Sequence, residues 1–536
     1  MPLHQTLLDY VRAQRARGID GLLLAGWGGS LAIVFGLFVA LWFSFGFWWV
    51  YWRSADMDTW MVYEAFLRTD GLPQTYFDHP GYLTILLLGY WFKLMHAIGF
   101  LPAHALSALP PESDIAASAA AWMRATQAAR LLSLGAALIF LGDFVLLMRR
   151  WLKDWRIALL ATYALAFSGG MMMEARIVRT ELIAAGFAYL ALLVLLAGAE
   201  RGANRRVLAV FVAALFGALA MLNKIQVIFP LLTFPVIVFA FMNPPTQDER
   251  ARPWGALIVA FIAAAVLTLF ALPLLQAGLF DAGAVARRTA LFHTGLPVYQ
   301  MIIAAWFVLW IFIVAWRFRL DAVETLAALA ALVAGSALGV LALMLHNDPG
   351  NAVAAMNPFE SMLNYAAASD PSLHAGGSLG TPMLRALVSG LALMLARLTF
   401  VLSSSPRPTI FLEWAVFAMM VFAWKRGERK AVWQAALLLV AAHAIDWPAT
   451  LRGLKTEYFI LADPLIIMAA AWLLVRVPAL QTHRLAYPVG AAVIAVTFAV
   501  GLAEPVKHSL KKDVPIDFCT PHNPRTGRIG RLSFCP

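Results

Sequence analysis

The sequence predicts an all-α protein that crosses a membrane many times. Of its 536 residues, 62% are hydrophobic and only 13% are charged, whereas about 25% of the residues of a soluble domain are charged. Many apolar runs approach or exceed the roughly 18 residues that a membrane-spanning helix needs. Backbone groups in lipid must bond to one another, so these runs are expected to be helices. Basic cytoplasmic loops explain the net charge of +11, which therefore indicates no nucleic acid partner.

The first apolar run, from about Ser30 to Val50, follows a basic N-terminal segment. It is too long for the apolar region of a secretory signal, and it ends in Trp48 and Trp49 rather than in a cleavage site. We therefore expect residues 1–28 to be cytoplasmic and residues 29–502 to form one transmembrane domain.

Clusters of arginine and lysine mark the cytoplasmic loops and predict the topology. The first span ends outside and Arg149 lies inside, so only one of the two intervening apolar stretches can cross. We expect Tyr82–Leu101 to lie in the outer interface instead, and Leu384–Val401 likewise. This leaves about thirteen crossings and two long outer loops, at about 51–130 and 346–409. After the first, the predicted spans are Leu131–Met148, Ile157–Met173, Leu182–Ala199, Val207–Leu222, Ile225–Met242, Trp254–Leu275, Val298–Trp316, Thr325–Leu345, Ile410–Trp424, Val432–Ala444, Phe459–Val475 and Pro488–Leu502.

The odd number of crossings predicts that the C-terminal tail, residues 503–536, lies on the outer side. This tail holds the two cysteines of the sequence, Cys519 and Cys535. A pair confined to a short tail favours one disulfide in an oxidising compartment, and two unpaired thiols are the alternative.

Acidic residues gather just after the first span, where a carboxylate is costly without a task or a partner. Asp58 could cap a helix that starts at Thr59, which leaves Asp56 free in the preceding loop. Further along the same outer loop, Pro80 is expected to start the interfacial helix, with His79 at its N-terminus. Asp56, Asp58 and His79 are therefore candidate site residues, and a solvated loop with a helix cap is the simpler alternative.

A second group lies in the predicted outer hairpin Glu174–Leu182. Arginine is unusual in a short outer loop, so Arg176 and Arg179 are candidates for binding an anionic group such as a phosphate. Being three residues apart, they could share one helix face. Glu181 is expected at the start of the next helix. Alternatively, Thr180 caps that helix and the arginines pair with the glutamates of the hairpin.

Three further residues are candidates for substrate binding. Lys224 falls inside an apolar run too long for one span, so we expect a second outer hairpin at Asn223-Lys224, where the lysine either reaches the interface or contacts a phosphate. Lys455 and Tyr458 precede a late span on the outer side. Surface charge and the aromatic belt of a membrane protein also explain those two.

In this order, these motifs resemble the GT-C glycosyltransferases that use lipid-linked sugars, such as protein O-mannosyltransferases and the lipid A aminoarabinose transferase. The resemblance covers about the first 230 residues best. It starts with the acidic motif after the first span and the histidine-proline pair. Ala175–Leu182 is similar to the segment that carries the family's second acidic residue. Asn223–Gln226 is similar to the family's lysine-containing turn. Glu457–Leu461 is similar to the start of the family's late helix, except that Glu457 replaces an arginine.

The resemblance implies a GT-C fold and transfer of a sugar from a polyprenyl-phosphate donor, with inversion, on the periplasmic face of a bacterial inner membrane. The acceptor could be a lipid, a glycan or a protein. Asp56 or Asp58 would be the general base and Glu181 a second catalytic acid, while the cations would bind the donor phosphate. Some relatives use a divalent cation such as Mg, Mn or Ca and others do not, so metal binding by these aspartates stays open.

Two other functions compete with this interpretation. A transporter or flippase of lipid-linked glycans would often show inverted repeats and helices broken at mid-membrane, and the sequence shows neither. A polysaccharide polymerase or ligase would also bind lipid phosphates, but it would not need paired acids in the first outer loop. A non-catalytic scaffold would leave the acidic motif unexplained.

Overall fold

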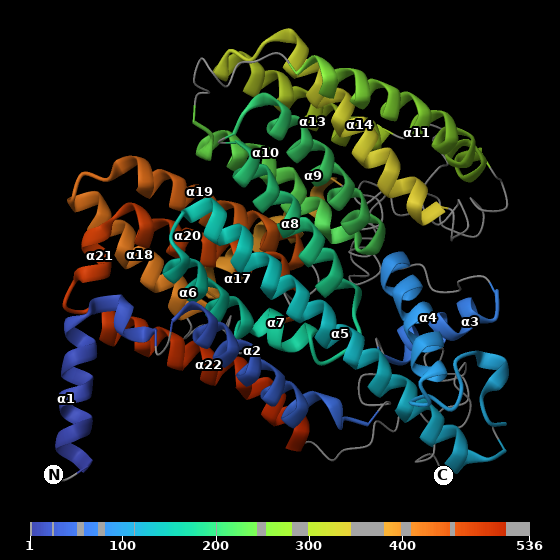
Figure 1. Cartoon of the computed structure of the whole chain (residues 1–536), viewed down its shortest axis with the longest axis horizontal. Coiled ribbons are helices and arrows are strands. Elements are labelled where there is room, and N and C mark those ends of the chain that lie inside the picture. Colours follow the sequence, from blue (N-terminus) through green and yellow to red (C-terminus); the bar gives the residue numbers. More distant parts are fainter. Residues whose placement is uncertain are drawn as a thin grey trace. The chain divides into compact units, whose positions relative to one another are not determined.

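The structure is a computed structural model that describes residues 3–23, 26–50, 58–72, 81–111, 113–199, 201–243, 253–280, 298–344, 380–397, 409–450 and 456–510. Every regular element in these residues is a helix, which confirms the predicted all-α fold (Figure 1). Seven helical segments in this part of the chain are long and apolar enough to cross a membrane, so the chain is a multi-pass membrane protein. They are Trp27–Phe47, Ile115–Leu152, Thr180–Ala199, Ala203–Asn223, Trp254–Ala271, Ala322–Ala342 and Ala486–Ala503.

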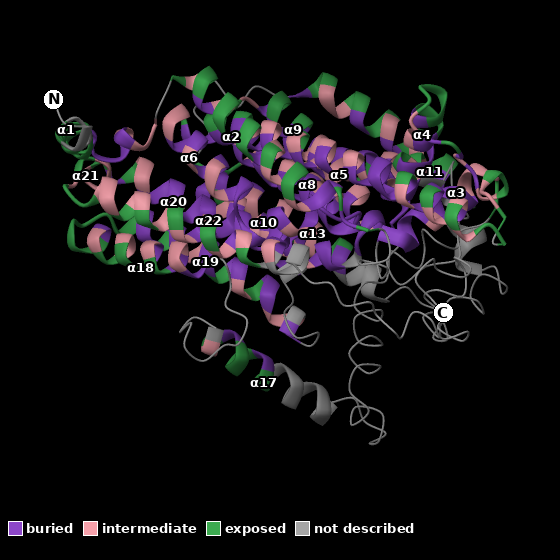
Figure 2. Cartoon of the chain, turned by 90° about the horizontal axis from the view of Figure 1, so that it is seen from below, coloured by how far each residue is buried: buried purple, intermediate pink, exposed green. Residues whose placement is uncertain are grey.

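The chain folds as two compact units, each assembled from separate stretches of sequence. Unit 1 comprises Met1–Leu41, Leu138–Met173 and Ser369–Val506, and unit 2 comprises Trp42–Ala137, Glu174–Ala368 and Lys507–Pro536. Buried residues run through the helices of both units (Figure 2).

In unit 2, one group of apolar helices packs around α9, which contacts both α8 and α14. The backbones of α9 and α14 come close because Gly335 and Gly339, four residues apart on α14, carry no side chain. A Cβ atom at Gly339 would lie only 2.7 Å from the Cβ of Ala218. Small residues at this spacing are a common device for packing helices in lipid. The helices of this group are α8 (Thr180–Ala199), α9 (Ala203–Asn223), α10 (Ile228–Phe241), α11 (Trp254–Phe280), α13 (Val298–Phe318) and α14 (Ala322–Met344).

The other part of unit 2 is built by α3 (Trp60–Thr69), α4 (Tyr82–Ala97) and the first half of α5 (Ile115–Leu152). Their shared core includes Phe66, whose ring centroid lies 5.2 Å from that of Phe92 and 5.5 Å from that of Trp122. The helix α4 begins at Tyr82, the first residue of the predicted interfacial stretch, and Pro80 lies outside the described residues. It is not among the seven candidate spans, and its interfacial position stays a prediction.

Unit 1 is centred on α20 (Asp463–Arg476), which is buried along most of its length between α6, α18 and α19. The indole rings of Trp151 and Trp472 stack here at 5.2 Å. Unit 1 also contains the second half of α5 and the helices α1 (Leu3–Ala16), α2 (Trp27–Trp42), α6 (Trp155–Ala166), α7 (Gly169–Glu174), α17 (Gly380–Arg397), α18 (Ile410–Lys425), α19 (Arg429–Ala449), α21 (Pro478–Thr482) and α22 (Ala486–Leu510). The last residue of α2, the last residue of α7 and the last four residues of α22 are counted in unit 2.

Some predicted spans are wrong as single α-helices. The predicted span Ile157–Met173 breaks after Ala166 and restarts as α7. A Cβ at Gly170 would lie 2.9 Å from the Cα of Ile460, so glycine permits a close approach at this break. The predicted span Phe459–Val475 begins instead as a short 3-10 helix, Thr456–Leu461, and α20 follows at Asp463.

Candidate functional site

A buried turn between α7 and α8 forms the centre of the candidate site. The helix α7 ends at Glu174 and α8 starts at Thr180, which confirms the predicted hairpin with Glu181 in the first turn of the next helix. The residues from Ala175 to Arg179 are not helical, and all of them are buried. The second predicted turn is also confirmed, because α9 ends at Asn223 and α10 begins at Ile228.

Asp58 joins this turn to two other segments through a buried ion pair. One of its carboxylate oxygens accepts hydrogen bonds from Arg130 Nε at 3.1 Å and Arg130 Nη2 at 2.6 Å. The other oxygen accepts the backbone N–H of Val178 at 2.6 Å. Arg130 Nη1 in turn donates to the carbonyl oxygens of Trp49 at 2.5 Å and Gly46 at 3.3 Å, at the end of the first apolar helix. Both side chains of the pair are fully buried.

This arrangement differs from the helix cap that was the simpler alternative for Asp58. The helix α3 starts at Trp60. The residue at its N-cap position is Thr59, not Asp58, and the Thr59 side chain forms no capping hydrogen bond. A partner distant in the sequence, Arg130, holds the Asp58 carboxylate instead. Burial raises the pKa of Asp58, and the charge of Arg130 and the amide of Val178 oppose that rise. Both Asp58 oxygens accept hydrogen bonds and the side chain is fully buried, so Arg130 and Val178 hold this carboxylate in place.

A second buried network connects the two turns of the site. Arg179 lies between two glutamates, with its Nε 3.4 Å from Glu174 Oε1 and its Nη2 3.1 Å from Glu181 Oε1. The ammonium group of Lys224 lies 2.6 Å from the same Glu181 oxygen, and both side chains are fully buried. Burial lowers the pKa of Lys224, and the negative charge of Glu181 opposes that effect. Arg179 therefore pairs with both glutamates of the hairpin, as the second of the two alternatives from the sequence predicted.

Asn223 links these turns to the start of α4. Its side-chain oxygen accepts hydrogen bonds from the backbone N–H and the hydroxyl of Thr84, each at 3.0 Å, while its side-chain nitrogen donates to the carbonyl of Thr180 at 2.8 Å. Its own carbonyl accepts the N–H of Gly81 at 3.0 Å. Gly81 has a φ of +60°, a left-handed conformation that glycine adopts at little cost. The neighbours of Lys224 are thus fixed by hydrogen bonds on several sides.

Arg176 and Arg179 do not share a helix face, so that prediction is wrong. Arg176 turns toward the end of the first apolar helix, where its guanidinium carbon lies 5.1 Å from the ring centroid of Trp49. Its Nη1 also approaches the carbonyl of Phe45 at 3.4 Å. The close fit of Arg176 depends on Gly46, because a Cβ there would lie 2.9 Å from Arg176 Cγ.

Several predicted site residues lie outside the described residues, namely Asp56, His79, Lys455, Cys519 and Cys535. Tyr458 is described and buried, in the 3-10 helix that precedes α20 in unit 1. Among the described residues, no group of three or more histidine, cysteine or acidic side chains is arranged to hold a metal ion.

The sequence did not identify Arg130 or Asn223 as site residues. It gave Glu174 only as a possible partner of the hairpin arginines. In the sequence, Arg130 lies immediately before a predicted span. In the structure it lies within one long helix, α5, so the feature that could have identified it is a charged side chain next to an apolar run. Such a residue needs a partner when it is buried.

An apolar groove of about 540 Å³ in unit 2 lies beside α9 and is also lined by residues of α8, α10, α13 and α14. Its lining residues on α9 extend from Arg206 to Leu222, which is about 24 Å of helix at 1.5 Å per residue. The Arg206 guanidinium forms a buried ion pair with Glu324 at one end, 2.6 Å from Nε to Oε1. At the other end, Leu222 directly precedes Asn223 and Lys224. The charged network and the groove therefore adjoin at the end of α9.

The fold and this site define a multi-pass, all-α membrane protein with a buried charged centre next to an apolar groove. Comparisons with protein-family models, with curated proteins and with solved structures find no match for the chain.

Proposed function

We propose that this protein is a membrane-embedded glycosyltransferase of GT-C type that transfers a sugar from a polyprenyl-phosphate donor to an acceptor. The observation that best supports the proposal is the hydrogen bond between Val178 and Asp58, because it brings the acidic segment after the first span to the turn that holds Arg179. Lys224 in turn contacts Arg179's partner Glu181, in the second network. Acids and cations from three distant parts of the sequence thus meet in one unit.

The groove beside α9 suits the lipid part of such a donor. A prenyl chain could lie along α9 in the apolar groove, while its phosphate approached Lys224 and Arg179 beyond Leu222. Positive groups in a buried site stabilise a developing phosphate charge far more than they would in water. Glu181 then has a positioning role, because it holds both cations in place between turnovers.

The reaction would proceed by direct displacement with inversion. Asp56 would remove the proton from the acceptor hydroxyl as general base, while the acceptor oxygen forms a bond to the anomeric carbon. The bond between that carbon and the phosphate oxygen breaks, and polyprenyl phosphate leaves with the electron pair. We assign the base to Asp56 rather than Asp58, because Arg130 and Val178 already occupy the Asp58 carboxylate.

The proposal also includes the predicted setting: about thirteen spans, a periplasmic site and C-terminal tail, a cytoplasmic N-terminus and a bacterial inner membrane. A divalent cation at Asp56 is compatible with the proposal. The acceptor is a hydroxyl of a lipid, a glycan or a protein.

The proposal is tested with the purified full chain in vesicles that contain polyprenyl-phosphate sugars, by measuring release of polyprenyl phosphate. Asp56→Asn should lower the rate by about 10²–10⁴-fold, the usual loss for a general base. It should leave thermal stability and the affinity for bare undecaprenyl phosphate unchanged. Asp114→Asn is the matched control, because this exposed carboxylate belongs to the same outer loop and only accepts the N–H of Ala117.

Full activity of Asp56→Asn would show that Asp56 is not the general base. If the vesicles instead moved the lipid-linked sugar across the bilayer without breaking the sugar–phosphate bond, the transporter alternative would replace the enzyme.

A further inference from the structure

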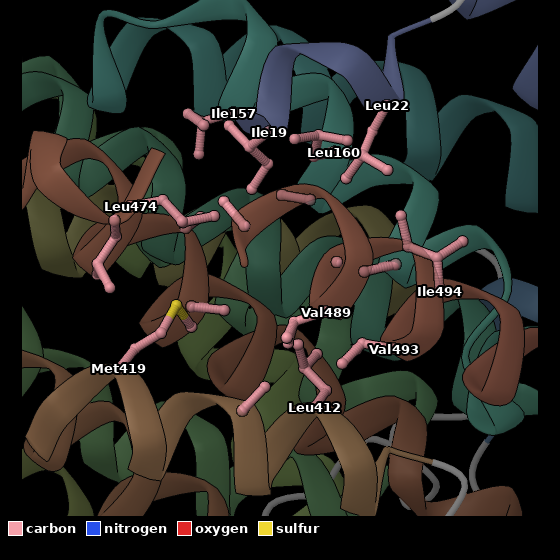
Figure 3. Close-up of a pocket in the computed structure, with 18 of the residues that line it drawn as sticks. Ile19, Leu22, Ile157, Leu160, Leu412, Met419, Leu474, Val489, Val493 and Ile494 are labelled. Atoms are coloured by element: carbon pink, nitrogen blue, oxygen red, sulfur yellow. The ribbon is translucent and has the colours of Figure 1, made fainter. Parts of the chain in front are cut away.

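A second apolar groove lies within unit 1, between α6, α18, α20 and α22 (Figure 3). It encloses about 300 Å³. Every side chain labelled in the figure is aliphatic or a methionine, and the polar lining residues are Tyr163, His483 and Thr497. The groove is open along one side, since its lining residue Val489 is 49% exposed. Such a site offers contacts to an alkyl chain and almost nothing to a polar ligand.

Small side chains line the groove on four of its helices. These positions are Ala161 on α6, Ala415 on α18, Ala471 on α20 and Gly490 on α22. In unit 2 the glycines of α14 bring two helices together, whereas here small residues of four helices face a shared space. Helices in a membrane normally use small residues for close packing, so a space lined by them is suited to another apolar body.

The helix α22 lines this groove along one side. The ring of Phe498, next to Thr497 at one end, lies 5.3 Å from that of Phe167, and within the lined stretch a Cβ on Gly490 would lie 2.8 Å from Leu22. Of the seven candidate spans, α22 is the least buried, with 11% of its apolar window inside the protein. Protein contacts alone therefore account for little of its packing.

The length of the groove matches one leaflet of a bilayer. On α22 its lining extends from Ala486 to Thr497, about 16 Å at 1.5 Å per residue. Half of a hydrocarbon core of about 30 Å is about 15 Å. An acyl chain from one leaflet fits this length, whereas a long polyprenyl chain would extend beyond it.

The end of the groove at His483 is basic. Arg17 and Arg484 are both exposed there, and neither forms an ion pair with the described residues. The two segments adjoin, because Gly18 packs against the backbone of Gln481 and Thr482. The distribution of arginine and lysine predicts that this end faces the cytoplasm. An anionic lipid headgroup would find cations at the point where its acyl chain enters the groove.

We propose that this groove binds one acyl chain of an anionic phospholipid from the cytoplasmic leaflet, with the lipid phosphate at the rim formed by Arg17, His483 and Arg484. The site is separate from the charged centre of unit 2, and the proposal holds whether or not the protein is a glycosyltransferase. The bound chain would take the place of a protein neighbour for α22.

The test is native mass spectrometry of the full chain, delipidated in detergent and titrated with palmitoyl-oleoyl phosphatidylglycerol. Wild type should retain one tightly bound phospholipid. Val493→Phe on α22 and Ala418→Phe on α18 add bulk inside the groove and should lower its retention at least tenfold. Ala495→Phe is the matched control, because this exposed residue lies on the same helix as Val493 and does not line the groove. Arg17→Ala with Arg484→Ala should lower the preference for phosphatidylglycerol over phosphatidylcholine at least threefold.

A photoreactive group near the end of the acyl chain supplies a readout that does not depend on stability. It should label Met419 or Ile494 in the groove in wild type and in Ala495→Phe. Equal lipid retention by the groove-filled and control variants, labelling of the outer face of α22 alone, or selective retention of undecaprenyl phosphate instead of phospholipid would each overturn the proposal.

Discussion

The interiors of the two units differ in polarity. In unit 2 the interior beside the hairpin is filled with charge, since Asp58, Glu174 and Glu181 are each held by a cation. In unit 1 the space between α6, α18, α20 and α22 is apolar and open. The long groove of unit 2 ends at the charged network, whereas the short groove of unit 1 ends at exposed arginines. A buried charge needs a fixed partner, while an apolar space needs only something of the right shape.

This difference indicates which parts of the molecule are specific. The ion pairs of unit 2 require particular atoms at particular distances, so single substitutions there should be severe. Contacts in unit 1 are numerous and individually weak, so the same kind of change should cost less.

The largest loss of stability is expected when the ion pair of Asp58 is broken. Arg130→Met leaves a carboxylate buried without its cation and also frees the carbonyls of Trp49 and Gly46. Removing one partner of such a pair costs about 3–5 kcal/mol. We expect a corresponding fall in the midpoint of thermal unfolding in detergent. Arg124→Met, an exposed position on the same helix, should change stability by no more than about 0.5 kcal/mol.

A double variant separates the ion pair from simple side-chain size. Asp58→Leu combined with Arg130→Met replaces both charges by apolar groups and should recover part of the loss. If the double variant were as unstable as the sum of the two single variants, the pair would not be the cause.

Asp58 and Arg130 show which parts of this site the sequence could predict and which it could not. The turns near residues 174–180 and 223–228 follow from the lengths of the apolar runs, and both are confirmed. The ion pair joins residues 72 positions apart, and no periodicity in the sequence reports such a pairing. Local reasoning therefore gave Asp58 as a candidate site residue with a helix cap as the simpler alternative, and it could not give its partner.

The groove of unit 1 was beyond prediction for a different reason. It is formed by small residues from helices that lie far apart in the sequence, such as Ala161 and Gly490. In the sequence these look like ordinary members of apolar runs. Only the packing shows that they face a common space. The same holds for the close approach at Gly170, which divides a run that was predicted to be one helix.

An intermediate effect is expected for Lys224. Lys224→Met removes one cation from Glu181, but Arg179 still holds that carboxylate. The cost should therefore be below that of Arg130→Met, about 1–3 kcal/mol. If Lys224 also binds the donor phosphate, the variant should lose at least tenfold in affinity for bare undecaprenyl phosphate.

A second variant separates these two roles of Lys224. Glu181→Gln perturbs the same ion pair but leaves both cations, so it should lower stability and weaken lipid phosphate binding less than Lys224→Met does. Equal affinity in wild type and Lys224→Met would assign the lysine to structure alone.

The smallest effect is expected for a neutral contact in unit 1. The hydroxyl of Tyr163 on α6 donates to the carbonyl of Ser30 on α2 at 3.0 Å. Tyr163→Phe removes this one hydrogen bond and keeps the ring that lines the groove, so unfolding should become easier by only about 0.5–1.5 kcal/mol. Lipid retention should stay at the wild-type level, because the apolar lining is unchanged. A loss as large as that of Arg130→Met would mean that unit 1, like unit 2, depends on a few fixed polar contacts, and the contrast between the units would fail.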